Sequence, residues 1–251
     1  METGEYHVLA RVEGSHWWFR QLHRKAIEAM KKEAQRVGRP LRVFDAGCGT
    51  GGLLAQVCEQ PWVELAAGCE PHPVALEHCR GQNLRVLGCN IETLPQWKPP
   101  PDLDVVLCLD VLYHRDVNPW QSTAVMASLL RPGGLMVINV AAMPCLQREH
   151  DCRVHGARRF LARELRNLVQ SNGLDVERLH YWNSWLTPLL WMKLRLAERS
   201  AHRSDSCSEL ELPNKGLNAC LSGLLWLEHL ANRWAPLPFG SSLFCQARKY
   251  R

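Results

Sequence analysis

Residues 43–52 read Val43-Phe44-Asp45-Ala46-Gly47-Cys48-Gly49-Thr50-Gly51-Gly52, an apolar strand that runs through an acid into a glycine-rich turn. Because glycine lacks a side chain and tolerates positive φ, such a turn lets a ligand approach the backbone closely. Two patterns fit this turn. Gly47, Gly49 and Gly52 match G-x-G-x-x-G, in which amides and a helix N-terminus hold a pyrophosphate. Asp45, Gly47, Gly49 and Gly51 match D-x-G-x-G-x-G.

The charge of Asp45 distinguishes the two patterns. A carboxylate at the end of the strand would repel a pyrophosphate, but it suits S-adenosylmethionine, which carries an ammonium group and a sulfonium. Glu70 lies nineteen residues after Gly51, at the end of a second apolar segment. An acid there binds the ribose hydroxyls of an adenosine cofactor of either class. The alternative is a turn without a ligand, and the shared register of strand, acid, turn and second acid argues against it.

The segment Asp45-Ala46-Gly47-Cys48-Gly49-Thr50-Gly51 resembles motif I of class I S-adenosylmethionine-dependent methyltransferases. Later landmarks, including Arg131-Pro132-Gly133-Gly134 before an apolar strand, extend the resemblance over nearly the whole chain. It implies an α/β fold: a doubly wound, seven-stranded Rossmann-like methyltransferase sheet with an N-terminal helical flap and a C-terminal helical insertion. S-adenosylhomocysteine would be the product of the cofactor.

The resemblance also implies where the cofactor binds. In the family an acid usually stands at the position of Asn90 and accepts a hydrogen bond from the adenine amine, which an asparagine oxygen can also accept. Ile91 would pack on the adenine, and the sulfonium would lie near Leu109 and Asp110. The expected cofactor residues are Trp17, Asp45, Gly47, Cys48, Gly49, Gly51, Glu70, Pro71, Asn90, Ile91, Leu109 and Asp110.

The first forty residues carry an aromatic segment, His16-Trp17-Trp18-Phe19, followed by a helical pattern that reaches about Val37 and ends at Gly38. The segment is similar to the N-terminal signature of a bacterial methyltransferase subfamily. It forms either a flap packed on the sheet edge or a lid over the cofactor. Where that subfamily usually has an arginine, this chain has Leu22, and Arg20 or Arg24 could replace the contact.

Candidate catalytic histidines follow the fourth and fifth predicted strands. The apolar run 103–109 ends in Asp110-Val111-Leu112-Tyr113-His114, with Tyr113 where the family commonly has glutamate. His114 is a candidate general base, or else it caps the following turn. His150 and His155 lie in the segment 141–160, which resembles the subfamily's H-D-…-R-R-[YF] pattern and also contains Arg158 and Arg159. This segment could bind an anionic or hydroxylated substrate, supply a base, or be a solvated loop.

The organisation that we expect is an N-terminal aromatic flap and helix over 1–40, a cofactor-binding core over 41–181, a helical insertion over 182–236 and a final strand of the core over 237–251. Two helices are expected in the insertion, near 185–200 and 216–233. Both are rich in tryptophan and leucine, so the insertion forms a substrate cap, a homodimer interface or a membrane-surface contact.

Composition narrows the function. The net charge is +5 over 251 residues, and the basic residues are scattered among acidic ones, so no nucleic-acid partner is expected. The eleven cysteines include no C-x-x-C, and no secretory signal opens the chain, which favours a cytoplasmic protein with free thiols. Residues 185–192 are too short to cross a bilayer. Cys69, His72, His78 and Cys79 match no zinc spacing, so no metal is expected.

Together these patterns predict a methyltransferase that methylates an oxygen, nitrogen or carbon atom of a small molecule, such as a natural-product or saccharide intermediate. Two related alternatives stay open. One is an enzyme that acts on a lipid-linked substrate at a membrane surface, and the other is a non-catalytic protein that keeps the cofactor fold. An NAD-dependent oxidoreductase is disfavoured by Asp45 and by the absence of a Tyr-x-x-x-Lys pair.

Overall fold

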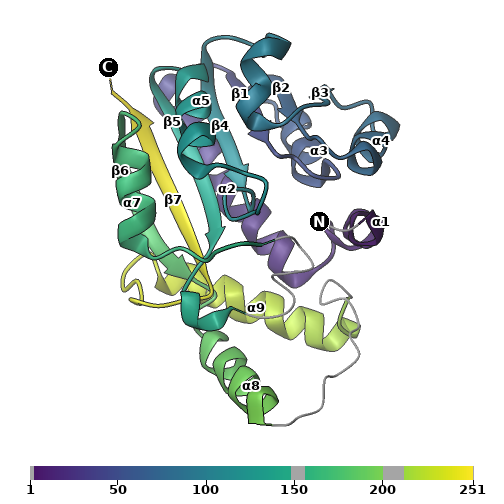
Figure 1. Ribbon diagram of the computed structural model, residues 1–251, viewed down its shortest axis with the longest axis vertical. Coiled ribbons are helices and arrows are strands. Elements are labelled where there is room, and N and C mark those ends of the chain that lie inside the picture. Colours follow the sequence, from purple (N-terminus) through teal and green to yellow (C-terminus); the bar gives the residue numbers. More distant parts are fainter. Residues whose placement is uncertain (1–2, 148–155, 200–211, 251) are drawn as a thin grey trace.

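The computed structural model describes residues 3–147, 156–199 and 212–250. Its centre is a seven-stranded sheet with the strand order β3-β2-β1-β4-β5-β7-β6 (Figure 1). β7 pairs antiparallel with both β5 and β6, and the other pairings are parallel. The strands are β1 (Leu41–Ala46), β2 (Val63–Cys69), β3 (Val86–Leu87), β4 (Leu103–Leu109), β5 (Leu130–Ala141), β6 (Leu174–Trp182) and β7 (Ser242–Lys249).

Helices cover both faces of this sheet, as the doubly wound prediction requires. On one face Met126 of α5 and Leu165 of α7 pack with Val106 and Ile138 of the central strands. On the other face the helices α2 and α3 pack against the same strands. The fold class is therefore confirmed. The helices of the core are α3 (Gly52–Cys58), α4 (Pro73–Gly81), α5 (Pro119–Leu129) and α7 (Ala162–Gln170), with the 3-10 helices η1 (Ile91–Trp97) and η2 (Pro144–Leu146).

The N-terminal segment forms two helices, α1 (Thr3–Val12) and α2 (Trp17–Val37). The second was predicted, and Gly38 ends it in the left-handed conformation with φ 73°. Its apolar side, including Ala26 and Met30, packs on a face of the sheet. The first helix was not predicted. It lies beside α4, and Tyr6 and Val12 are its buried apolar residues.

The C-terminal insertion contributes α8 (Thr187–Arg199) and α9 (Lys215–Ala231), close to the predicted ranges. Figure 1 shows both helices beyond one end of the sheet, with α9 against the start of α2. The Trp17 amide donates to Asn218 Oδ1 over 2.9 Å, and the Asn218 amide donates to the Ser15 carbonyl over 3.0 Å. The insertion thus fixes the point where α2 begins.

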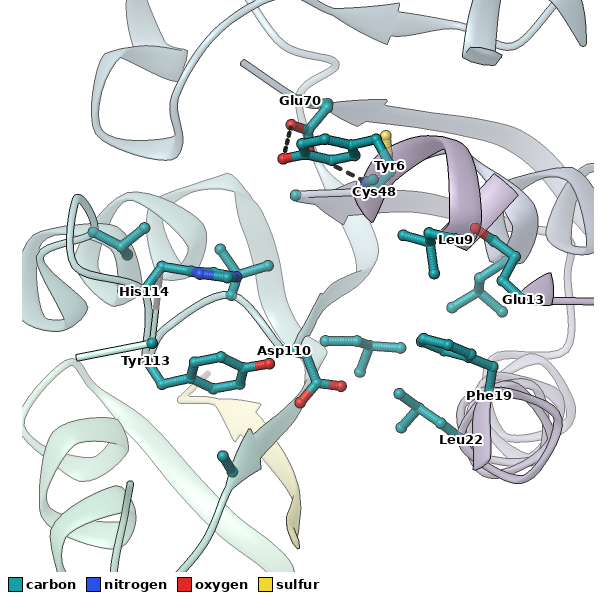
Figure 2. Close-up of a pocket in the computed structure, with 18 of the residues that line it drawn as sticks. Tyr6, Leu9, Glu13, Phe19, Leu22, Cys48, Glu70, Asp110, Tyr113 and His114 are labelled. Atoms are coloured by element: carbon teal, nitrogen blue, oxygen red, sulfur yellow. Dashed lines mark hydrogen bonds between the residues drawn. The ribbon is translucent and has the colours of Figure 1, made fainter. Parts of the chain in front are cut away.

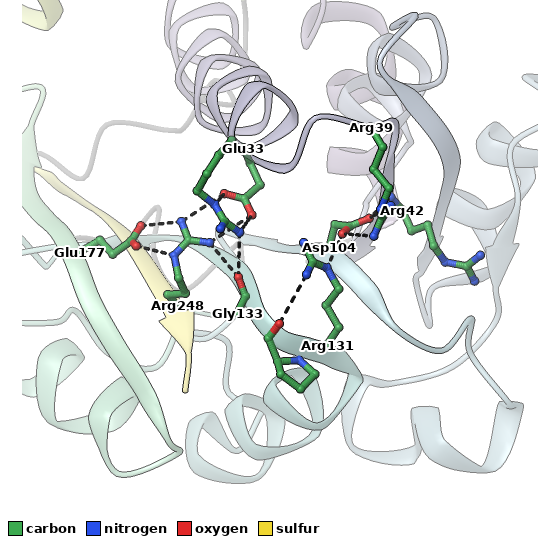
Figure 3. Close-up of polar contacts among 10 residues, drawn as sticks. Glu33, Arg39, Arg42, Asp104, Arg131, Gly133, Glu177 and Arg248 are labelled. Atoms are coloured by element: carbon green, nitrogen blue, oxygen red, sulfur yellow. Dashed lines mark hydrogen bonds and ion pairs between the residues drawn. The ribbon is translucent and has the colours of Figure 1, made fainter. Parts of the chain in front are cut away.

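Buried ion pairs join the elements at the amino ends of the parallel strands (Figure 3). Asp104 is fully buried and accepts from both Arg39 Nη2 at 2.8 Å and Arg131 Nε at 2.5 Å. Glu33 of α2 accepts from Arg248 of β7 over 3.1 Å, and Arg248 also pairs with Glu177 of β6. These contacts hold α2 and the outer strands in place from the end opposite the site described next.

Candidate active site

A cavity of about 1310 Å³ opens at the carboxyl ends of the parallel strands. Ligands bind outside these ends in doubly wound sheets, because the loops that follow the strands diverge there. The ends of β1, β2 and β4 form its floor, and α1, the first turn of α2 and α8 form its walls. Figure 2 shows Tyr6, Leu9 and Glu13 on one side of it and Tyr113 and His114 on the other.

One end of the cavity is acidic. Asp45, Glu70 and Glu13 all line it, and their exposed fractions are only 3%, 5% and 8%. The Gly49 amide donates to Glu70 Oε2 over 3.2 Å, and the His72 amide donates to Glu70 Oε1 over 3.0 Å. These bonds turn the carboxylate of Glu70 toward the glycine-rich turn.

The pKa values of all three acids are raised. Burial and, to a smaller extent, the negative charges of Glu13 and Glu70 together raise the pKa of Asp45 to about 7. Burial also raises the pKa of Glu70 and of Glu13. A site that gathers three acids away from water is stabilised by a positively charged ligand. The three acids therefore fit a cofactor with an ammonium group and a sulfonium.

Helix α1 adds two side chains to this end that the sequence did not reveal. The Tyr6 hydroxyl donates to Glu70 Oε1 over 3.4 Å, and the ring of Tyr6 stacks on His72 at 4.2 Å between centroids. Just after α1, Glu13 accepts from the Thr50 hydroxyl and the Gly52 amide. Both contacts join residues far apart in the sequence, and neither follows a recognisable motif.

The glycines of the turn have separate roles. Gly47 has φ 83°, and a Cβ there would lie 2.5 Å from Val111 Cγ2, so only glycine fits beside the loop after β4. Gly47 and Gly49 line the cavity. Gly51 has φ 87° and begins α3, and a Cβ there would meet Leu84 Cδ1 at 2.5 Å. Gly51 is not among the described lining residues, so the structure places it behind the turn.

The other expected cofactor residues line the same cavity. Asn90 and Ile91 follow β3, and Asn90 precedes η1. Five more residues that were expected from the sequence also line the cavity: Trp17, Cys48, Pro71, Leu109 and Asp110. The positions of Arg20 and Arg24 differ from these, since both side chains are exposed on α2 and absent from the described lining.

The middle of the cavity holds Asp110, Tyr113 and His114 (Figure 2). Asp110 follows β4 in the left-handed conformation with φ 61°, a geometry that aspartate tolerates better than most residues. Burial raises the pKa of Asp110 to about 7, although hydrogen bonds from Asn139 and Tyr113 lower it. His114 pairs through its backbone with Gly156. His150 and His155 lie outside the described residues.

The end farthest from the acids combines arginine and leucine. Among the described lining residues, the basic side chains of the lysine and arginine type are those of Arg158 and Arg159. The Arg159 guanidinium donates to the Ala142 carbonyl over 3.1 Å, and Arg158 lies over the ring of Phe160 at 5.7 Å. Opposite them α8 and the loop before it contribute apolar side chains, Leu186, Leu189 and Leu190.

Several remaining features concern the described residues as a whole. No group of three or more His, Cys, Asp or Glu residues in the described ranges is arranged to hold a metal ion. Within 3–147, 156–199 and 212–250 no helix is both long and apolar enough to cross a membrane. The nine described cysteines are free thiols, and Cys48, Cys69 and Cys89 lie along the cavity.

The sequence matches the methyltransferase domain family over residues 18–179. This match covers more than half of the 251 residues, so the chain belongs to that family. It is a class I S-adenosylmethionine-dependent methyltransferase, and its cofactor is S-adenosylmethionine. No curated protein sequence matches the chain.

Solved structures show the same fold. A S-adenosylmethionine-dependent methyltransferase from Archaeoglobus fulgidus has a TM-score of 0.53 at 15% identity, with 90% of this chain and 94% of that one covered. Geranyl diphosphate methyltransferase with GPP and sinefungin has a TM-score of 0.52 at 16% identity, with 84% and 71% covered. Haemonchus contortus phosphoethanolamine N-methyltransferase 2 with S-adenosyl-L-methionine has a TM-score of 0.52 at 16% identity, with 85% and 49% covered.

Proposed function

We propose that this enzyme transfers the methyl group of S-adenosylmethionine to an oxygen, nitrogen or carbon atom of a small molecule that has an apolar part. One observation carries the proposal. A single cavity of about 1310 Å³ joins the acidic end to the end lined by α8. A pocket for one drug-sized ligand measures roughly 300–1,000 Å³, so this cavity has room for a cofactor and an acceptor together.

The acidic end suits the cofactor. Asp45 would pair with its ammonium group, Glu70 would accept from its ribose hydroxyls, and Asn90 and Ile91 would hold its adenine. Helix α1 would cover it, because Tyr6 already contacts Glu70 and Leu9 lines the same end. The bound cofactor supplies an activated methyl group on a good leaving group, so the remaining work of the protein is to position the acceptor and exclude water.

The far end suits the acceptor. Leu186, Leu189 and Leu190 offer it apolar surface, and Arg158 and Arg159 offer hydrogen-bond donors to a polar or anionic group. Basic residues are interspersed with acidic ones along the sequence, which favours a small molecule over a nucleic acid. The cytoplasm remains the expected location.

The test begins with calorimetric titration of S-adenosylhomocysteine, followed by an acceptor screen. Phenols, amines and carboxylic acids, each with and without an alkyl chain, would be incubated with S-adenosylmethionine, and S-adenosylhomocysteine formation would be measured. We expect turnover with an alkyl-bearing acceptor, and we expect it to fall in Leu189→Asp. Turnover that prefers acceptors without an apolar part would contradict the proposed acceptor class.

A lipid-linked acceptor at a membrane surface is a second candidate, favoured by the exposed apolar side chains of α8. Leu189 is 57% exposed, Met192 50% and Trp191 47%, and Leu189 also lines the cavity. A hydrophobic tail could therefore pass from a bilayer along α8 to the site. Binding to phospholipid vesicles, lost in Trp191→Asp, would favour this candidate, whereas a concentration-dependent dimer lost in the same variant would assign the surface to a homodimer.

A further inference from the structure

A chain of buried polar contacts runs beneath the middle of the cavity and ends at Asp110. The Trp182 indole Nε1 donates to Asn139 Oδ1 over 2.8 Å. Asn139 Nδ2 in turn donates to both carboxylate oxygens of Asp110, each over 3.0 Å. Trp182 is 1% exposed and Asn139 is fully buried, so water does not compete for these bonds.

This chain fixes which way the Asn139 amide points. An indole N–H can only donate, so the atom that faces it must be the amide oxygen. The nitrogen of the same side-chain amide therefore faces Asp110. Trp18 of the N-terminal aromatic segment stacks on Trp182 at 5.4 Å between centroids, which holds the indole in place. A tryptophan at the end of β6 therefore sets the position of an acid at the end of β4.

Asp110 is held from the other direction as well. Its amide donates to the Asn139 carbonyl over 2.9 Å, which fixes the left-handed turn after β4. The Tyr113 side chain donates a hydrogen bond to its carboxylate, and Figure 2 shows the two groups meeting inside the cavity. A carboxylate has about four lone-pair sites. The half-buried carboxylate of Asp110 thus keeps acceptor capacity toward the cavity that it lines.

On the basis of the function proposed above, we propose that Asp110 is the catalytic residue that accepts the proton of the acceptor's O–H or N–H group, with Tyr113 as its partner and with Asn139 and Trp182 as positioning residues. The acceptor heteroatom forms the new bond to the methyl carbon, and the bond from that carbon to sulfur breaks with its electron pair left on sulfur. The proton passes to a carboxylate oxygen of Asp110 and later to solvent.

The surroundings of Asp110 suit a base that works at neutral pH. Its pKa of about 7 results first from burial, which raises it, and then from the bonds of Asn139 and Tyr113, which lower it. The titratable groups that interact with it are Tyr113 on the following loop and Cys108 on β4, whose thiol pKa is raised by burial and by Asp45 and Asp110. Such a carboxylate is ionised above about pH 7 and is a far better base than an exposed aspartate.

Tyr113 stands where related enzymes commonly have glutamate, and this difference affects the pKa of Asp110. A second carboxylate beside Asp110 would raise its pKa, whereas a phenol hydroxyl lowers it by donating a hydrogen bond. The same hydroxyl lies at the cavity surface, where it can also contact an acceptor oxygen or nitrogen.

The first test measures protonation directly. Carbon-13 NMR would follow the aspartate carboxyl resonances against pH, with S-adenosylhomocysteine present, in the wild type and in Asp110→Asn, Tyr113→Phe and Trp182→Phe. We expect a resonance that titrates near pH 7, is lost in Asp110→Asn, and moves to higher pH in Tyr113→Phe. The proposal is overturned if the resonance lost in Asp110→Asn titrates in the ordinary range of aspartate.

The second test measures turnover with the first alkyl-bearing phenol or amine that the wild type methylates. We expect Asp110→Asn to lower kcat about a hundredfold or more at saturating S-adenosylmethionine, and S-adenosylhomocysteine affinity would be measured beside it. Trp182→Phe should lower kcat less and shift its pH profile. Matched controls are Asp102→Asn and Trp120→Phe, which alter exposed residues away from the cavity.

Two outcomes distinguish a failure of this proposal from a failure of the proposed function. A wild type that does not bind S-adenosylhomocysteine would contradict the proposed function itself. Normal cofactor binding with a kcat in Asp110→Asn within threefold of the wild type would contradict only the role of Asp110.

Discussion

Asp45 is the proposed partner of the cofactor's ammonium group, and in the ligand-free protein its charge is destabilising. It is 3% exposed and lies beside two other acids, so its negative charge is costly until a cation arrives. The sequence predicted its place at the end of β1 and its contact with a positive cofactor. The neighbouring Glu13 was not predictable, because it reaches the turn only through the fold of the N-terminal segment.

The raised pKa of Asp45 predicts how stability depends on pH. Between about pH 4 and about pH 7 the folded protein keeps a proton on Asp45 that the unfolded chain has lost. The associated stability is present below the unfolded pKa and is lost as the pH rises through the folded pKa. Asp45→Asn should therefore stabilise the ligand-free protein at pH 8 by on the order of 2 kcal/mol, with little effect at pH 4.

Urea denaturation at both pH values would measure this effect, with Asp102→Asn as the exposed control. A free energy of unfolding at pH 8 that is equal to or lower than that of the wild type would contradict the destabilising effect assigned to the charge of Asp45.

Lys25 of α2 is a buried cation with the opposite pH dependence. Its ammonium nitrogen lies 3.1 Å from His180 Nε2 and 5.3 Å from the ring of Trp182. Burial and, to a smaller extent, the charge of Arg178 lower the pKa of Lys25 to about 7. Above about pH 7 the folded state therefore binds fewer protons than the unfolded state, so this residue adds stability as the pH rises toward about 10.5.

Lys25→Met should remove this gain. Chemical denaturation between pH 7 and pH 9.5 should show a rise in the free energy of unfolding that is smaller, by roughly 1–2 kcal/mol, than in the wild type. Lys32→Met changes an exposed lysine of the same helix and should keep the wild-type slope. Identical slopes for all three proteins would show that Lys25 stays charged in the folded state.

Among the elements, the strands were the most predictable and α1 the least. Apolar runs such as Leu103–Leu109 belong to strands buried on both faces, and they show this directly in the sequence. Helix α1 has only ten residues, too few to be stable alone, so its contacts with α4 and the cavity hold it rather than its own propensity. β3 is an edge strand of only two residues, Val86–Leu87.

The ion pairs around Asp104 stabilise the start of β4, and their loss should be costly. Asp104 accepts from Arg39, Arg131 and the Arg42 amide, and it has no exposed surface. Asp104→Ala leaves these donors without their acceptor and should lower the free energy of unfolding by about 3 kcal/mol. Thermal and urea unfolding would measure this loss.

The matched control is Glu64→Ala. Glu64 is 57% exposed and lies 4.0 Å from Arg42, so its removal should cost less than about 1 kcal/mol. Similar losses for the two variants would contradict the weight given to burial at Asp104.

Taken as one molecule, the protein places its site between segments that are distant in sequence. The N-terminal helices and the insertion meet at Asn218 and at the pair of His229 and Glu28, 2.9 Å apart. The sheet, the glycine-rich turn, Asp45 and Glu70 were predictable from local patterns. The pairing of Trp182 with Asn139 was not, because it depends on where β5 and β6 end relative to one another.

The most direct measurement is calorimetric titration of S-adenosylmethionine, S-adenosylhomocysteine and NADH into the wild type and Asp45→Ala. We expect the first two to bind the wild type with dissociation constants in the micromolar range, to lose most of that affinity in Asp45→Ala, and NADH not to bind. Binding of NADH alone, or S-adenosylmethionine affinity that is unchanged in Asp45→Ala, would contradict the assignment of the acidic end to a cationic cofactor.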